Sequence, residues 1–292
     1  MKKIIALGFF DGVHLGHQAL LKECCRLAKA LNCETAAITF EDHPQSLFLE
    51  SPPALINTVQ DRHSLLRHYG IDHVYTFPVT QEVMSTNWAA FLEQLLEDGV
   101  AGFVCGKDFR FGCYGEGNAE KLEDFCRTRD LPCVIVQDQM LEGTRISSTH
   151  IRALLEAGEM ERAVRFLGHP HILTGTVVPG RHLGRTIGIP TANLTLPEDV
   201  VQLRRGVYIC RALLEGELFP AVTNVGTRPT VGGTHVTVEP WLLDFDRDLY
   251  GKTLTLEFYS YLRPEIKFPS LEALREEIQK NALEVRKFFD KN

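Results

Sequence analysis

The feature that most constrains this chain is the stretch at residues 8–17, which reads GFFDGVHLGH. A short apolar run at residues 4–7 precedes it and is typical of a buried strand. After it, apolar residues recur at helical spacing up to Leu31. Residues 8–17 therefore predict a tight turn between a strand and a helix, with glycines where a larger side chain would hold other groups away.

The two histidines of this turn are placed to meet one ligand. His14 and His17 are three residues apart at the start of the expected helix, so both side chains can face the same point. A helix N-terminus carries unpaired N–H groups and the positive end of the helix dipole, and both favour phosphate. The pattern predicts a cradle for a polyphosphate. The alternative is a turn whose histidines are only solvated.

Length and charge narrow the class of protein. The chain has 292 residues, enough for about two domains. Its net charge of −7 argues against a broad nucleic-acid surface. No apolar run approaches the roughly 20 residues that span a bilayer, and the N-terminus has no secretory pattern. The eight cysteines include no C-x-x-C pair, which favours reduced thiols. We expect a cytoplasmic protein without a nucleic-acid or membrane partner.

The first half of the chain alternates between strand and helix patterns. Strands are expected at residues 4–9, 35–40, 73–79, 102–105 and 133–136. Helices are expected at residues 17–31, 60–69, 88–96, 119–128, 149–156 and 160–167. This alternation predicts a doubly wound parallel sheet covered on both faces. Ligands of such sheets bind beyond the carboxyl ends of the strands, which is where residues 8–17 would lie.

The pattern changes near residue 168. Short strands separated by Gly and Pro are expected at residues 172–178, 207–213, 221–225, 235–241 and 253–261, which favours a small antiparallel barrel. A final helix follows, with Ser270 as its cap. One apolar stripe runs along this helix: Leu271, Leu274, Ile278, Ala282, Val285 and Phe289. We expect two closely joined domains at residues 1–168 and 169–292.

A second motif surrounds the expected start of the helix at residue 149. Three hydroxyl residues, Ser147, Ser148 and Thr149, lie between Arg145 and Arg152. The hydroxyls alone are explained as competitors for the N-cap. Guanidinium groups on both sides of a helix N-terminus, however, again suit a phosphate chain.

A third motif, GKDFRFG at residues 106–112, follows an expected strand. Asp108 in this motif is placed to hold a ribose or a metal-bound water. The alternative is an ordinary polar turn between a strand and a helix.

The three motifs resemble the adenylyltransferase half of bacterial bifunctional riboflavin kinase/FAD synthetases, within the wider superfamily of His-x-Gly-His nucleotidyltransferases. The second half resembles the kinase half of the same family and keeps its motif order. Its motifs are GTVVPG at 175–180, GR at 184–185, GIPTAN at 188–193, NVGTRPT at 224–230 and LRPE at 262–265. The resemblance covers essentially the whole chain.

This resemblance implies a Rossmann-like nucleotidyltransferase domain that adenylylates FMN to FAD and releases pyrophosphate. It implies His14 and His17 as catalytic residues. The residues that it implies for ATP binding in this domain all lie within the three motifs: Gly8, Phe9, Asp11, Gly16, Asp108, Arg145, Ser147, Ser148, Thr149 and Arg152.

For the second domain, the resemblance implies a riboflavin kinase barrel that makes FMN. Glu239 would accept the proton of the attacking hydroxyl. Thr191 and Asn193 supply neutral oxygens on one face of an extended chain, which suits Mg²⁺. The implied ATP-binding residues are Gly175, Gly180, Gly184 and Arg185. The implied flavin-binding residues are Asn224, Gly226, Thr227, Arg228 and Arg263.

Riboflavin, FMN, FAD and ATP are thus the expected partners, with Mg²⁺ as the metal that accompanies ATP. The oligomeric state is open, with a homo-oligomer as one option. Two other functions also remain open. One is a nucleotidyltransferase for a different phosphorylated acceptor, such as a pyridine nucleotide or pantetheine phosphate. The other is a non-catalytic binder of flavin or nucleotide.

Overall fold

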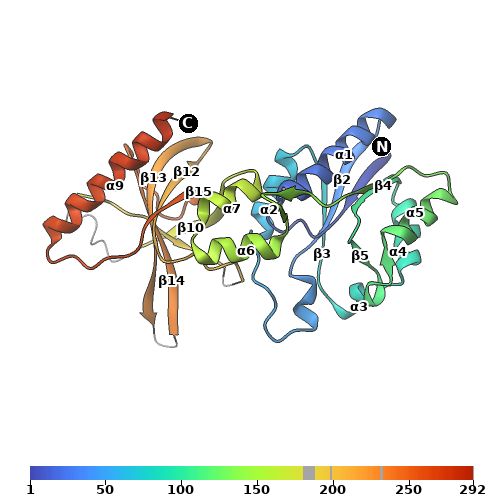
Figure 1. Cartoon of the computed structure of the whole chain (residues 1–292), viewed down its shortest axis with the longest axis horizontal. Helices are drawn as coiled ribbons and strands as arrows, with labels where there is room; N and C mark the ends of the chain where they lie inside the picture. The colour runs from blue at the N-terminus through green and yellow to red at the C-terminus, as the bar shows by residue number, and fades with distance from the viewer. Residues whose placement is uncertain (180–187, 198, 231–232, 292) are drawn as a thin grey trace. The chain divides into compact units, whose positions relative to one another are not determined.

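The computed structural model describes residues 1–179, 188–197, 199–230 and 233–291, with the backbone alone at residues 228–230 and 233–235. The chain forms two compact units, Met1–Ser148 and Thr149–Asn292. Figure 1 shows the strands and helices of both units. The helices α6 (Ser148–Ala157) and α7 (Met160–Leu167) precede the expected domain boundary at residue 168, but they fall almost wholly in the second compact unit. The expected domain boundary stays a prediction.

The first unit is built on a five-stranded parallel sheet in the order β3-β2-β1-β4-β7. Its strands are β1 (Lys3–Leu7), β2 (Glu34–Phe40), β3 (His73–Phe77), β4 (Val100–Gly106) and β7 (Cys133–Val136). Its longer helices are α1 (Leu15–Leu31), α2 (Val59–His68), α4 (Trp88–Glu97) and α5 (Ala119–Arg127). These elements confirm the expected alternation of strands and helices.

The central strand β1 is buried on both faces. Ile5 and Leu7 join a core formed with α4, α5 and Phe103 of β4. Ile4 and Ala6 point to the opposite face, because successive strand side chains alternate, and both are 0% exposed. Helix α1 packs along β1 and β2. The sheet is therefore doubly wound, as the apolar run at residues 4–7 predicted.

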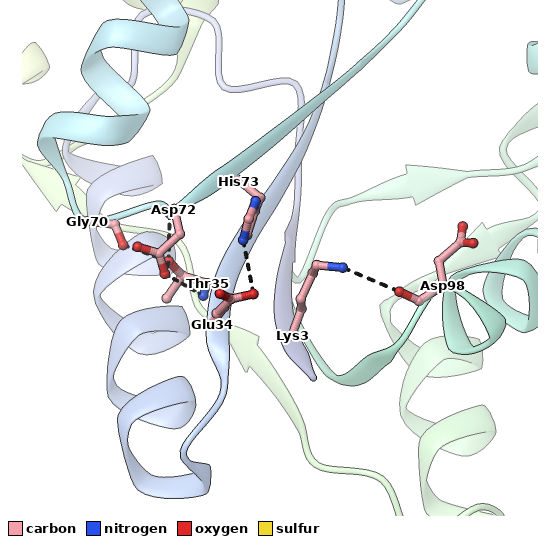
Figure 2. Close-up of polar contacts among 7 residues, drawn as sticks. All are labelled: Lys3, Glu34, Thr35, Gly70, Asp72, His73 and Asp98. Atoms are coloured by element: carbon pink, nitrogen blue, oxygen red, sulfur yellow. Dashed lines mark hydrogen bonds and ion pairs between the residues drawn. The ribbon is translucent and has the colours of Figure 1, made fainter. Parts of the chain in front are cut away.

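Polar contacts connect residues at the starts of β2 and β3 (Figure 2). This is the amino end of the sheet, whereas residues 8–17 follow the carboxyl end of β1. The Asp72 carboxylate accepts a hydrogen bond from the Thr35 N–H at 2.9 Å, and the Thr35 hydroxyl donates to the Gly70 carbonyl at 2.8 Å. His73 lies 3.1 Å from Glu34 in the same view. These bonds join the segment before β3 to the start of β2.

Several short elements of the first unit carried no sequence signal. They are η1 (Pro44–Leu47), α3 (Gln81–Met84), β5 (Arg110–Phe111), η2 (Cys113–Gly115), β6 (Gly117–Asn118), β8 (Met140–Leu141) and β9 (Thr144–Arg145). The pairs β5–β6 and β8–β9 form two small antiparallel hairpins. Elements of two to four residues are too short to show hydrophobic periodicity, so they could not be predicted.

The second unit is a closed antiparallel barrel in the order β10-β11-β14-β13-β12-β15, with β15 paired again to β10. Its strands are β10 (His171–Val178), β11 (Asn193–Thr195), β12 (Gly206–Leu214), β13 (Glu217–Thr230), β14 (Gly233–Leu242) and β15 (Thr253–Arg263). The final helix is α9 (Leu271–Lys291), and the Ser270 hydroxyl accepts from the Ala273 N–H at 3.2 Å. The expected barrel and cap are confirmed.

In the part of the chain that the structure describes, no helix has both the length and the apolar character that a membrane crossing requires.

Candidate active sites

The turn at residues 8–17 joins β1 to α1 and places its two histidines face to face. His14 is the N-cap of α1, and its Nδ1 accepts a hydrogen bond from the His17 N–H at 3.2 Å. The two rings are stacked, with centroids 3.6 Å apart and planes within 9°. A Cβ at Gly16 would lie 3.1 Å from the His14 ring, a tight contact that would require the ring to shift slightly. The spacing thus brings both histidines together.

His17 is neutral at pH 7 in this environment. Burial holds its pKa well below the usual histidine value, and the neighbouring His14 and Arg62 lower the pKa further. Its Nδ1 atom is buried, and no group among the described residues forms a hydrogen bond with it. His17 is therefore a neutral hydrogen-bonding group of the turn, and a positive charge beside it comes from another residue.

Arg62 of α2 supplies that charge, and sequence reasoning missed it. The side chain is 0% exposed. Its Nη1 donates to the Thr39 hydroxyl at 2.9 Å and to the Phe40 carbonyl at 2.5 Å, at the carboxyl end of β2. The guanidinium carbon lies 4.6 Å from the centre of the Phe9 ring. A single arginine on a helix carries no local pattern, so only the tertiary structure places it beside the turn.

Asp11 and Ser148, both expected to bind ATP, have contacts that hold the turn in place. The buried Asp11 carboxylate accepts from the Ile56 N–H at 2.8 Å. The Ser148 hydroxyl donates to the Asp11 carbonyl at 2.9 Å across 137 residues of sequence. These bonds join the turn to the segments before α2 and at the start of α6, which is a positioning role.

Asp108 and Arg145, two further residues expected at the ATP site, are paired with each other. The Arg145 Nε also lies 3.2 Å from Asp138, and Lys107 lies 3.2 Å from the same carboxylate. The pair with Asp108 raises the pKa of Arg145. An ATP phosphate that binds Arg145 must therefore displace or share a carboxylate partner.

Five ATP-site residues expected in the first half of the chain remain. Gly8 and Phe9 directly follow β1, and Ser147 directly precedes α6. Thr149 and Arg152 lie on the part of α6 that belongs to the second unit. A role for these two at the turn stays a prediction.

The second unit contains a cavity of about 430 Å³ that gathers four of the residues expected in the kinase half: Thr191, Asn224, Glu239 and Arg263. Most of the other lining side chains are apolar and come from the barrel, from α9 and from the segment before α9: Ile189, Val207, Val222, Trp241, Ile266, Phe268, Leu271, Leu274 and Ile278. A mostly apolar cavity with a few polar groups is typical of a small-molecule site.

Glu239 lies between two asparagines on the neighbouring strands. On one side, Glu239 of β14 is directly opposite Asn224 of β13. On the other side, Asn193 of β11 faces Glu239, because the next pair along is Leu194 with Val238. Side chains directly opposite each other share a face of the sheet. Thr191, two residues before Asn193, is on that face as well, and it lines the cavity with Glu239.

Glu265 is a second carboxylate of this cavity that sequence reasoning left without a role. It accepts a hydrogen bond from the Asn224 side chain at 3.4 Å. A Cβ at Gly226 would lie 2.6 Å from the Glu265 Oε1 atom, so a larger residue there would make the Glu265 side chain move. The packing explains this glycine of the motif at residues 224–230.

Two other expected residues of the kinase half, Thr227 and Gly175, are not among the residues that line the cavity. Thr227 is opposite Val236, on the strand face that carries Val225 rather than Asn224. Gly175 lies within β10, opposite Leu254. Gly180, Gly184 and Arg185 lie outside the described residues, as does the side chain of Arg228.

Together these features define the class of protein. A parallel α/β domain with a histidine-bearing turn at the carboxyl end of its first strand is followed by a barrel with a carboxylate-lined cavity, and this combination of two ligand sites fits a two-site transferase. Residues 1–150 match the family model described as FAD synthetase, and residues 167–289 match the one described as riboflavin kinase. The chain belongs to the bifunctional riboflavin kinase/FMN adenylyltransferase family.

Curated relatives of this name match along the whole chain. The relative from Listeria monocytogenes is 34% identical over 100% of this chain and 94% of its own length. The relative from Pseudomonas fluorescens is 36% identical over 97% and 92%, and the one from Escherichia coli K12 is 35% identical over 98% and 92%. A solved structure described as a macrolide-efflux protein from Streptococcus pneumoniae has a TM-score of 0.87 at 28% identity, covering 98% of this chain and 94% of that one.

Proposed function

We propose that riboflavin is phosphorylated in the barrel cavity and that the resulting FMN is adenylylated at the turn formed by residues 8–17. The observation that carries the first assignment is the position of Glu239, in the cavity and opposite both Asn193 and Asn224. The apolar lining suits the flavin ring system, and the polar residues gather around Glu239. The hydroxyl end of riboflavin, which becomes phosphorylated, therefore reacts at this polar cluster.

In the kinase step, the 5′-hydroxyl of riboflavin attacks the γ-phosphorus of ATP, and ADP leaves. Glu239 accepts the hydroxyl proton through its carboxylate. Asn224, directly opposite, keeps the carboxylate in a polar setting at the edge of an apolar cavity. Most of the catalysis in such a transfer comes from positioning and electrostatics.

Activities of this kind with ATP use a divalent metal, and we propose Mg²⁺. Thr191 and Asn193 carry hard oxygen donors, of the kind that Mg²⁺ prefers, on the same face as Glu239. Bound there, the ion would neutralise charge on the ATP phosphates. Thr191 and Asn193 would hold it and orient the phosphate beside the attacking hydroxyl, with the Glu239 carboxylate left to accept the proton.

In the adenylyl step, the phosphate of FMN attacks the α-phosphorus of a second ATP and expels pyrophosphate. His14 and the neutral His17 would donate hydrogen bonds to phosphate oxygens at the N-terminus of α1. The guanidinium of Arg62 is the fixed positive charge near them. No protein nucleophile takes part, so stabilisation of negative charge carries the step.

The test uses purified protein with riboflavin and Mg-ATP, and flavins are separated by chromatography. Glu239→Gln should lower FMN formation by about 10²–10⁴-fold and still convert supplied FMN to FAD. His17→Ala should form FMN and stop there. Equal loss of both products in both variants would show that the division between the two sites is wrong.

We further propose that the protein works in the cytoplasm, without a nucleic-acid or membrane partner, which its net charge of −7 supports for nucleic acid. Sedimentation of the purified chain decides between a monomer and a homo-oligomer.

A further inference from the structure

The apolar stripe of α9 serves two different purposes along its length. In the first half of the helix, Leu271, Leu274 and Ile278 line the cavity. In the second half, Ala282 and Val285 are buried in a core cluster with barrel residues of β12 and β13. The helix is thus anchored to the barrel by one half, and its other half is a wall of the cavity. Asn281 lies at the point where the two halves meet.

Asn281 is a buried polar side chain, 2% exposed, in this apolar stripe. Its Oδ1 accepts two hydrogen bonds from Arg263, from Nε at 3.1 Å and from Nη2 at 2.8 Å. Its Nδ2 donates to Glu277 at 3.4 Å, and the same Glu277 oxygen lies 3.3 Å from the Arg263 Nε. The guanidinium of Arg263 is therefore bonded to α9 through its Nε and Nη2 atoms.

These bonds close the base of the segment at residues 264–270, which connects β15 to α9. Arg263 is the last residue of β15, before the segment, and Asn281 lies in the middle of α9, after the segment. The segment contributes Glu265, Ile266 and Phe268 to the cavity. The bonds between Arg263 and Asn281 thus fix both this segment and the first half of α9 relative to the barrel strands.

We propose that Asn281 is a positioning residue, which through Arg263 holds the α9 wall at the distance from Glu239 that the flavin ring requires. The proposal rests on the assignment of this cavity to riboflavin. In this proposal Arg263 bonds to α9 and affects the flavin indirectly, through the position of the α9 wall. Asn281 then acts on riboflavin binding, and the phosphoryl transfer at Glu239 is unaffected once the flavin is bound.

The experiment measures KM for riboflavin, KM for ATP and kcat of FMN formation in the full chain. Asn281→Leu removes the acceptor and keeps the size of the side chain. We expect it to raise KM for riboflavin about tenfold, with kcat and KM for ATP within about twofold of wild type. Asn281→Asp keeps an oxygen that accepts from Arg263 and should restore KM to within about threefold. The exposed Gln279→Leu is the control on the same helix.

A merely structural role would lower the active fraction, which reduces kcat and leaves KM unchanged. Asn281→Leu with an unchanged KM for riboflavin would overturn the proposal, as would equal effects of the Leu and Asp variants. If Asn281→Leu does not fold, Glu277→Leu removes the carboxylate that contacts both Asn281 and Arg263, and an unchanged KM for riboflavin in that variant overturns the proposal equally. If Glu239→Gln leaves FMN formation intact, it is the cavity assignment that fails.

Discussion

Burial influences the charge state of residues around the turn at residues 8–17. His14 and His17 are stacked and partly or wholly removed from water, and the pKa of His17 lies well below its usual value. Arg62 is fully buried and remains charged, because a guanidinium keeps its proton in proteins. A fixed cation, Arg62, therefore lies beside a His17 ring that stays neutral at physiological pH.

Arg62 should affect the ionisation of His17 directly. Its positive charge is one of the causes that lower the pKa of His17, so Arg62→Gln should raise that pKa. The shift is measured by NMR titration of the His17 imidazole. Arg67→Gln, at an exposed position of the same helix, is the matched control and should leave it unchanged. An equal shift in both variants would contradict a local effect of Arg62.

At the scale of elements, the first domain separates the contacts that hold the sheet from those that form the site. The bonds among Thr35, Gly70 and Asp72 lie at the amino ends of the strands (Figure 2). The turn at residues 8–17 lies at the carboxyl ends, as is usual in open parallel sheets. The stability of the sheet and the chemistry of the turn should therefore respond to different substitutions.

Asp72→Ala should destabilise the first domain by about 1–3 kcal/mol, because the Thr35 N–H loses its acceptor. At 25 °C it should leave the kcat of FMN adenylylation unchanged. Urea unfolding and a steady-state assay check the two expectations. Asp98→Ala is the control, since Lys3 bonds to the backbone carbonyl of Asp98 and not to its carboxylate. A loss of kcat equal to the loss in a turn variant would refute the separation.

At the scale of the whole molecule, buried histidines make the stability of the protein depend on pH. His171, the first residue of β10, is 0% exposed. Neither of its ring nitrogens has a hydrogen-bond partner among the described residues. Burial lowers its pKa to about 3, and the nearby His169 contributes to the shift. The folded barrel therefore keeps this ring neutral in mildly acidic solution.

An unfolded chain protonates histidine below about pH 6.5, so between that pH and about 3 the unfolded state binds the additional proton. The free energy of unfolding should fall as the pH is lowered through this window, by up to about 1.4 kcal/mol per pH unit from His171. His171→Leu should flatten the dependence of the barrel transition between pH 6.5 and 4.5, as followed by urea unfolding. The exposed His68→Leu should keep the wild-type slope, and an identical slope in the His171 variant would refute the assignment.

The two domain types and the long strands and helices could be predicted from the sequence, which also singled out two stretches as candidate nucleotide sites. These features are encoded locally. An apolar run such as residues 4–7, or the stripe from Leu271 to Phe289, fixes an element through its own periodicity. The spacing of His14 and His17 likewise places both on the first turn of one helix, and the structure keeps them together.

Which distant residues lie beside the turn and beside Glu239 depends on the tertiary structure. Arg62 meets the turn because α2 packs at the carboxyl end of β2, and Glu239 lies between Asn193 and Asn224 because three strands pair in one register. The same register turns Thr227 to the opposite face, and it brings Glu265 over Gly226. Register and helix docking depend on contacts between segments far apart in the chain, and no local pattern specifies them.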